Sequence, residues 1–164
     1  MFATIACARL RRPGLDARGL TPTQFSSAEE KARMGDAILS FIARGMPQTG
    51  FSKALYTRVS SMWGFIACYN RDGFWGRHLA STAGRVGFLE QIARYPCFGQ
   101  AAFTWCDVER EIATRIREHS LLEAYRDACA REREGNERRQ LAALLARYGS
   151  DGAAQPEAAQ LGLF

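Results

Sequence analysis

Apolar side chains recur three and four residues apart through most of the chain, and this spacing constrains the fold more than any other feature. In the segment 27–44, for example, the apolar positions include Met34, Ile38, Leu39 and Ile42. A helix places residues three or four apart on one face, whereas a strand places every second residue on one face. The pattern therefore predicts an all-α fold, with about five to six helices that each bury one side.

Capping residues and helix breakers mark where the first helices begin and end. Ser27 and Glu30 have the spacing of a capping box, and Gly45 with Pro47 stops the helix that follows. Ser52 is a suitable N-cap for a second helix, over 52–63. The next segment, 64–69, is compatible with a continuation of that helix or with a short strand. The residues 70–73 (Asn-Arg-Asp-Gly) then predict a turn.

The remaining boundaries follow from the same signals in the second half of the chain. Capping residues predict three further helix starts, and breakers predict where those helices stop. The predicted starts are Ser81 or Thr82, Thr104 with Asp107, and Ser120 with Glu123. The predicted stops are Tyr95 with Pro96, a break near residue 119, and Gly149. Gly135 with Asn136 predicts a stop and possible restart.

Length and composition favour one domain with two irregular ends. The chain has 164 residues, of which 47% are hydrophobic, enough to bury a core. Proline and glycine interrupt residues 1–25, which we expect to be an irregular N-terminal arm. Residues 26–149 form the expected helical domain. Residues 150–164 form the expected flexible tail, in which 150–159 have linker composition and span about 15–20 Å as a random coil.

The charge distribution allows nucleic-acid binding without requiring it. Lysine and arginine together number 22 and acidic residues 17, for a net charge of +5. Arginine and glutamate alternate along the expected helices. Asp107, Glu109 and Glu111 lie among Arg110 and Arg115, and we expect them to form a salt-bridged, solvated helix face.

The cysteines and histidines offer no recognised catalytic or metal-binding motif. The five cysteines are odd in number and widely spaced, with no Cys-x-x-Cys pair. We therefore expect buried, reduced thiols in a cytoplasmic protein, with no metal site, no cofactor and no membrane span. An enzyme that pairs Cys68 or Cys106 with His78 or His119 is a minority alternative. His119 is better explained by its place at a helix end.

Aromatic and basic side chains are interleaved in the segment 50–80. Such a mixture is typical of surfaces that stack the bases of single-stranded nucleic acid, and it is also typical of core aromatics beside a solvated face. The core interpretation is favoured here because the aromatics recur near helical spacing. The candidate nucleic-acid contacts are Lys53, Arg58, Trp63, Arg71, Trp75 and Arg77.

The last five residues form an apolar tip on a polar tail. They are Gln160, Leu161, Gly162, Leu163 and Phe164. A hydrophobic tip on a flexible segment is typical of a peptide that docks in a partner's groove. The leucine and phenylalanine side chains can fill apolar pockets, the glutamine can hydrogen-bond at a rim, and Gly162 lets the backbone bend between the anchors.

This Gln-Leu-x-Leu-Phe sequence resembles the short motif by which bacterial polymerases and mismatch-repair proteins dock on the β sliding clamp. The resemblance implies that Gln160 occupies a polar rim, Leu161 a small pocket, and Leu163 with Phe164 a larger one. It covers five residues only. The run Gly64 to Phe74 is also similar to small proteins of plasmids and integrative elements.

Together these features favour a clamp-binding accessory protein of DNA replication or repair. The alternative is a nucleic-acid-binding regulator of a mobile element, whose C-terminal peptide is incidental.

Overall fold

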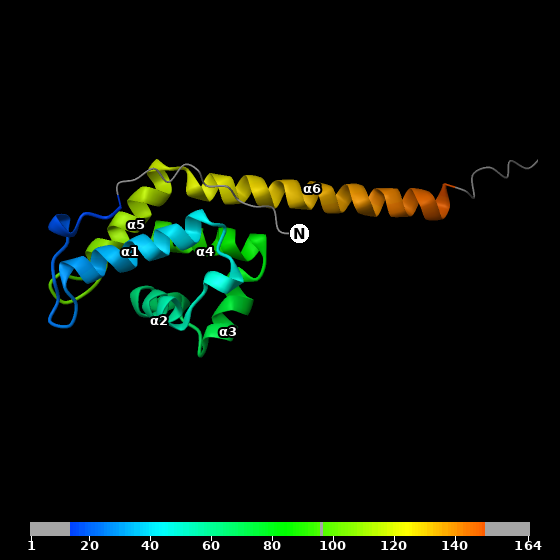
Figure 1. Cartoon of the computed structure of the whole chain (residues 1–164). Coiled ribbons are helices and arrows are strands. Elements are labelled where there is room, and N and C mark those ends of the chain that lie inside the picture. The colour runs from blue at the N-terminus through cyan, green and yellow to red at the C-terminus, as the bar shows by residue number, and fades with distance from the viewer. Residues whose placement is uncertain (1–13, 96, 150–164) are drawn as a thin grey trace, which may run out of the picture. The chain divides into compact units, whose positions relative to one another are not determined.

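The computed structural model describes residues 14–95 and 97–149. Within these ranges the chain forms six α-helices and no strand, which confirms the all-α prediction (Figure 1). The helices are α1 (Ala28–Ala43), α2 (Lys53–Met62), α3 (Arg71–Phe74), α4 (Thr82–Arg94), α5 (Cys106–Glu118) and α6 (Leu121–Tyr148).

The chain divides into two compact units, and the division falls inside α6, between Cys129 and Ala130. The first unit contains α1 to α5 and the first turns of α6. In the second unit the described residues are those of the rest of α6 and Gly149. The expected tail, residues 150–164, and the docking peptide within it lie outside the described residues.

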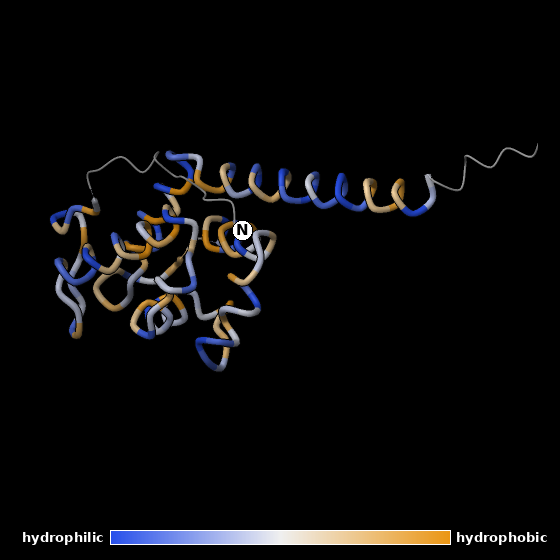
Figure 2. Tube along the Cα trace, turned by 45° about the vertical axis from the view of Figure 1, so that its right-hand side comes forward, coloured by the Kyte–Doolittle hydropathy of each residue, from blue (hydrophilic) through white to orange (hydrophobic). Residues whose placement is uncertain are grey.

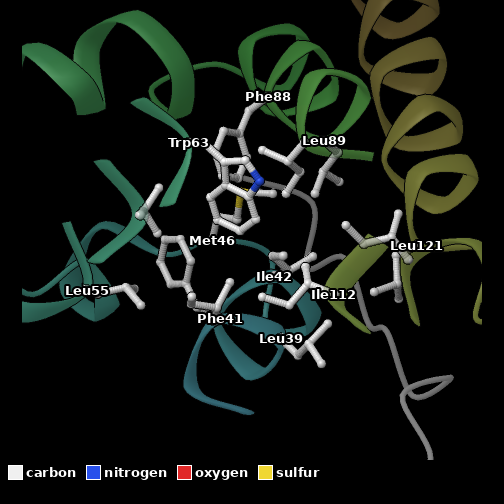
Figure 3. Close-up of a cluster of buried hydrophobic side chains, with 14 of the residues drawn as sticks. Leu39, Phe41, Ile42, Met46, Leu55, Trp63, Phe88, Leu89, Ile112 and Leu121 are labelled. Carbon is white, nitrogen blue, oxygen red and sulfur yellow. The ribbon is translucent and has the colours of Figure 1, made fainter. Parts of the chain in front are cut away.

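The core of the first unit is assembled around α1, which contacts α2 and α5, while α4 packs against α5. Side chains from these helices and from the start of α6 converge around Trp63, which is 1% exposed (Figure 3). The Trp63 ring meets Phe88 edge to face, at a centroid distance of 6.3 Å. Each fully buried aliphatic or aromatic side chain contributes about 1.5–3 kcal/mol to folding, so this cluster is the main source of stability.

Three of the expected serine caps are confirmed at the starts of α1, α2 and α4. The Ser27 hydroxyl accepts a hydrogen bond from the Glu30 amide at 3.1 Å, and the Glu30 carboxylate accepts one from the Ser27 amide at 3.3 Å. Ser52 caps α2 through the Leu55 amide, and Ser81 caps α4 in the same way. Because these oxygens satisfy amides that lack a helical partner, each cap contributes about 1 kcal/mol.

The turn after α1 places a methionine in a left-handed backbone conformation. Gly45 has φ 89° and Met46 has φ 53°. The Met46 amide donates to the Phe41 carbonyl at 3.0 Å, and its side chain is fully buried. Burial of the thioether thus offsets a conformation that costs a non-glycine residue about 1–2 kcal/mol.

The segment after α2 differs from both expectations. Residues Gly64–Ile66 form a single 3-10 turn, neither a longer α2 nor a strand. The expected turn at 70–73 is instead the start of α3, because the Asn70 side chain accepts from the Gly73 amide at 2.7 Å and caps the helix. A π-helical turn, Trp75–Leu79, follows directly.

Two predictions for the later helices are wrong, and a third is confirmed. Thr104 and Asp107 do not form a capping box: α5 begins at Cys106, after Trp105, and the Asp107 carboxylate turns inward. Gly135 does not interrupt α6, whose Glu134 and Arg138 form an i,i+4 ion pair across that position at 2.5 Å. The break near residue 119 is confirmed, since α5 ends at Glu118 and Ser120 has φ 51°.

The described part of the expected N-terminal arm is irregular but packed. It contains one 3-10 turn, Ala17–Gly19, and the side chains of Leu15 and Leu20 are buried on either side of it. The Leu15 amide donates to the Asp36 carboxylate of α1 at 2.7 Å. Leu15 and Leu20 therefore belong to the core of the first unit.

The second unit has no buried residue among its described members. Its large apolar residues lie in the last turns of α6, after a run of mostly charged residues (Figure 2). Leu141, Leu144, Leu145 and Tyr148 are each more than half exposed. Across the described ranges, every helix is too short or too polar to cross a membrane.

Candidate functional site

The two tryptophans chosen as base-stacking candidates belong mainly to the core. Trp63 is 1% exposed, so its indole offers no free face to a ligand. Trp75 is half-buried, and its ring lies 5.8 Å from that of Phe51, which is buried. The core interpretation holds for Phe51, Trp63 and Phe74, which are buried, whereas Phe65 and Tyr69 are exposed.

The basic candidates lie on the surface, and two of them share a hollow. Lys53 and Arg58 line a shallow depression of about 540 Å³ together with Met34. The Arg58 guanidinium stacks over the ring of Trp105 at 3.7 Å, a cation–π geometry. Burial lowers the pKa of Arg58, and Glu30 opposes that shift. Arg71 and Arg77 are exposed elsewhere, with Arg71 at 3.6 Å from Asp72.

A buried ammonium holds the loop that follows α4. The Lys31 side chain is fully buried, and its Nζ contacts the Ala101 carbonyl at 2.9 Å, the Thr104 carbonyl at 2.8 Å and the Asp107 carboxylate at 3.0 Å. The same carboxylate accepts from the Thr21 amide at 2.9 Å. An ammonium has three protons to donate, so every donor is used. Asp107 is therefore the acidic partner in a buried ion pair with Lys31. This corrects the prediction that Asp107 lies on a solvated helix face.

Beside this loop lies an open pocket of about 350 Å³ between α4 and α5. Its walls come from the last turn of α4, from the loop at residues 95 and 97, and from one face of α5. Three arginines are among its lining residues, Arg94, Arg110 and Arg117, and the single acidic residue among them is Glu109. At its rim, the exposed ring of Tyr95 packs edge to face on that of Phe65, at 5.3 Å. The residues that line the pocket therefore have a net positive charge, with one acidic group among them.

Cys97 and Cys106 form a disulfide at the wall of this pocket, with their Cα atoms 5.4 Å apart. This corrects the expectation that all the cysteines are reduced thiols; Cys68 and Cys129 are free. Cys97 is half-buried and lines the pocket, whereas Cys106 is fully buried as the first residue of α5. The two sulfur atoms therefore differ in access to solvent.

Glu109 lies close to this disulfide. Its carboxylate oxygen and the two sulfur atoms all lie within 4.8 Å of one another. Such a triad has the donor types of a metal site, but in the disulfide form neither sulfur is a thiolate that could coordinate an ion. Burial raises the pKa of Glu109 to about 7, and the attraction of Arg110 only partly opposes the shift. This carboxyl therefore exchanges protons near neutral pH.

Sequence reasoning missed this site because no motif spans it. The two cysteines are separated by eight residues, and one lies in a loop whose path depends on Lys31. The available signal was the i,i+3 spacing of Cys106 and Glu109, which places both on one face of a helix.

In the described structure, the hydrogen bonds of His78 and of Cys68 both go to the Ile66 carbonyl rather than to each other. His78 is buried, and its Nε2 lies 3.0 Å from the Ile66 carbonyl, a contact in which the ring donates. Burial is the main reason that the pKa of His78 is lowered. His119 is the C-cap of α5, in agreement with its predicted place at a helix end. Cys106, the thiol of one proposed pair, is bonded to Cys97.

Comparisons with protein-family models, with curated proteins and with solved structures found no match to this chain.

Proposed function

We propose that this protein docks on the bacterial β sliding clamp through its C-terminal residues Gln160–Phe164. The observation that carries the proposal is the sequence Gln-Leu-Gly-Leu-Phe at the end of the chain, after ten residues rich in alanine, glycine and glutamine. Docking on the clamp places the protein in the bacterial cytoplasm, at replicating or repaired DNA.

The chemistry of these five residues suits a shared, reversible docking groove. Leu161, Leu163 and Phe164 each gain about 1.5–3 kcal/mol when fully desolvated. Ordering five residues costs about 1–2 kcal/mol each in backbone entropy, which cancels most of that gain. The peptide alone therefore binds weakly, and contacts between the helical body and the clamp or DNA increase its residence there.

One peptide supports two cellular roles. A protein that carries it is recruited to the clamp, and in the same act occupies the groove that polymerases use. The resemblance of Gly64 to Phe74 to mobile-element proteins supports an accessory protein of such an element, which borrows the host's clamp.

Binding of the purified, untagged protein to immobilised β clamp tests the proposal. A chain lacking residues 160–164 and the double variant Leu163→Ala/Phe164→Ala should both lose binding, by at least about tenfold, because the apolar anchors are gone. Ala158→Ser is the matched control, since it changes the same tail outside the motif. A synthetic peptide of residues 155–164 should compete with the intact protein. Equal binding by the intact and shortened chains would reject clamp docking.

A second candidate function, nucleic-acid binding, is favoured by the hollow that brings Lys53 and Arg58 together beside Trp105. For this function the chain lacking residues 160–164 should still bind a single-stranded oligonucleotide, with an affinity that falls as salt rises. Lys53→Gln/Arg58→Gln should lower the slope of log affinity against log salt by about 1. The exposed pair Arg71→Gln/Arg77→Gln tests the other cations of the segment. Absence of salt-dependent binding would exclude this candidate.

A further inference from the structure

We propose that the Cys97–Cys106 disulfide is a thiol–disulfide exchange site, and that the pocket between α4 and α5 admits a small anionic thiol as its substrate. This activity is independent of the C-terminal peptide and lies in the first unit.

The difference in access between the two sulfur atoms sets the direction of attack. Cys97 lines the pocket and is half-buried, so an incoming thiolate in the pocket reaches its Sγ. Cys106 is fully buried and faces no solvent. Cys97 is therefore the sulfur that is attacked, and Cys106 is the one that leaves.

The start of α5 favours a thiolate at the leaving sulfur. Cys106 is the first residue of the helix, and its amide donates to the Thr104 hydroxyl at 3.4 Å. The amides of a first turn carry partial positive charge, which stabilises an anion there. A sulfur at such a position leaves as a thiolate more readily than one in apolar surroundings.

Glu109 is placed to exchange a proton with that sulfur. Its carboxyl group lies within 4.8 Å of both sulfur atoms, one helical turn after Cys106. Because its pKa is raised to about 7, a large share of the carboxyl groups is protonated at neutral pH and can donate to a thiolate. The charged and titratable groups around it are Arg94 of α4, Tyr95 and Cys97 of the loop, and Cys106, Arg110 and Arg117 of α5.

The exchange needs no cofactor, because the electrons and protons come from the thiols and from Glu109. A substrate thiolate attacks Sγ of Cys97, a substrate–Cys97 disulfide forms, and the Cys97–Cys106 bond breaks. The electron pair goes to Sγ of Cys106, which takes a proton from Glu109. A second substrate thiolate then attacks the substrate sulfur of the mixed disulfide and releases Cys97 as a thiolate. Two thiols are oxidised to one disulfide, and the protein disulfide is reduced by two electrons. The reverse sequence, with an oxidised substrate, restores the protein disulfide.

The charge of the pocket selects the substrate. Arg94, Arg110 and Arg117 line it against one carboxyl that is often neutral. A thiol that carries a carboxylate is therefore attracted, and a thiol that carries an ammonium is repelled. Two small thiols of similar size, 3-mercaptopropionate and cysteamine, differ in this charge and serve as probes.

The experiment uses the full chain with Cys7, Cys68 and Cys129 replaced by serine, so that only the disulfide cysteines react. Alkylation before and after thiol treatment, followed by mass spectrometry, gives the rate of reduction of the native protein. At equal thiolate concentration, 3-mercaptopropionate should react about tenfold faster than cysteamine, and Arg110→Gln with Arg117→Gln should reduce that ratio and its salt dependence.

Single-cysteine variants identify the attacked sulfur. The Cys106→Ser variant, treated with the oxidised form of 3-mercaptopropionate, should retain a mixed disulfide on Cys97. The Cys97→Ser variant should leave Cys106 unmodified while folded. Equal modification of both variants, or reduction only after unfolding in urea, would show a purely structural disulfide and overturn the proposal.

Glu109→Gln tests the proton transfer separately from folding, which circular dichroism checks. This near-isosteric variant should slow the exchange roughly tenfold or more and remove the inflection of the rate near pH 7. Glu118→Gln is the control, because it removes an exposed carboxylate of the same helix outside the pocket. An unchanged rate and pH profile in Glu109→Gln would exclude a role for this acid.

Discussion

At the scale of single residues, Lys31 and Asp107 join distant parts of the first unit. Their ion pair is buried, and it also contacts the carbonyls of residues 101 and 104 and the amides of Thr21 and Val108. A buried charge that loses its partner keeps its desolvation cost without the compensating attraction. These residues are therefore more sensitive to substitution than the exposed ion pairs of the same chain.

We predict that Lys31→Met lowers the free energy of unfolding by about 3–5 kcal/mol, because the Asp107 carboxylate stays buried without its cation. Urea denaturation followed by circular dichroism measures the change. The matched control is Arg126→Gln, which removes an exposed pair with Glu90 at 2.8 Å and should cost less than about 1 kcal/mol. Similar losses in both variants would contradict the burial argument. Lys31→Met/Asp107→Leu should recover part of the loss, since no buried charge remains.

A second residue-scale prediction concerns pH. The pKa of Glu109 is about 7 in the folded chain and near 4.5 when solvated, so between these values the folded state binds a proton that the unfolded state does not. Stability should therefore fall as pH rises from about 4.5 to 7, by about 1 kcal/mol after allowing for partial exposure of the group. Glu109→Gln should remove this decline.

The measurement compares urea unfolding of the wild type and of Glu109→Gln at pH 4.5, 6 and 8. His78 acts in the opposite direction: its lowered pKa gives stability that is present above pH 6.5 and is lost as pH falls. Both chains carry His78, so their difference isolates Glu109. A difference that does not grow between pH 4.5 and 8 would count against the raised pKa.

At the scale of elements, the helices that the sequence predicted best are those with a serine cap. Ser27, Ser52 and Ser81 act within three residues of themselves, so local spacing suffices to find them. Asp107 was misread because its acceptor role is set by Lys31, 76 residues away. Long-range contacts decide such cases, and no short pattern reports them.

Gly135 was misread for a different reason. A glycine within a helix costs about 1 kcal/mol relative to alanine, and this cost was taken as a stop. The residues on both sides favour helix strongly enough to continue through it. A local penalty of this size shifts the stability of a helix without ending it.

We predict that Gly135→Ala increases the helicity of the second unit and stabilises it by roughly 1 kcal/mol. A methyl group added at this position meets no other atom within 4 Å, so no clash opposes the gain. Amide hydrogen exchange across residues 130–148 measures the effect. Gly84→Ala is the contrasting variant, because its methyl group would lie 2.9 Å from the His78 carbonyl oxygen and should destabilise α4. Unchanged exchange in Gly135→Ala would mean that the glycine does not limit α6.

At the scale of the whole molecule, stability resides in the first unit. Every buried residue of the described chain lies between Leu15 and Ala128. We predict that a chain ending at Arg133 unfolds in urea with a free energy within about 0.5 kcal/mol of the full chain, because it keeps the whole core. It should also keep thiol–disulfide exchange and lose clamp binding. A loss of several kcal/mol would show that residues after 133 support the core.

The sequence predicted the fold class because helical periodicity is present in every long segment. It did not predict the pocket, because Cys97, Glu109 and the arginines meet only after the loop at 97–105 is held by Lys31. The docking peptide is the reverse case. Its residues are contiguous, so a sequence pattern alone suggests its function.

The contacts of Lys31 also bear on the order in which parts of the chain can pack as they are synthesised. Its ammonium group finds its acceptors at residues 101, 104 and 107, so helix α1 leaves the ribosome long before its buried cation can be neutralised. Until α5 emerges, the interior of the first unit cannot close around that charge. The separation of these contacts along the chain therefore predicts that α1 to α4 do not form a closed core before α5 joins them.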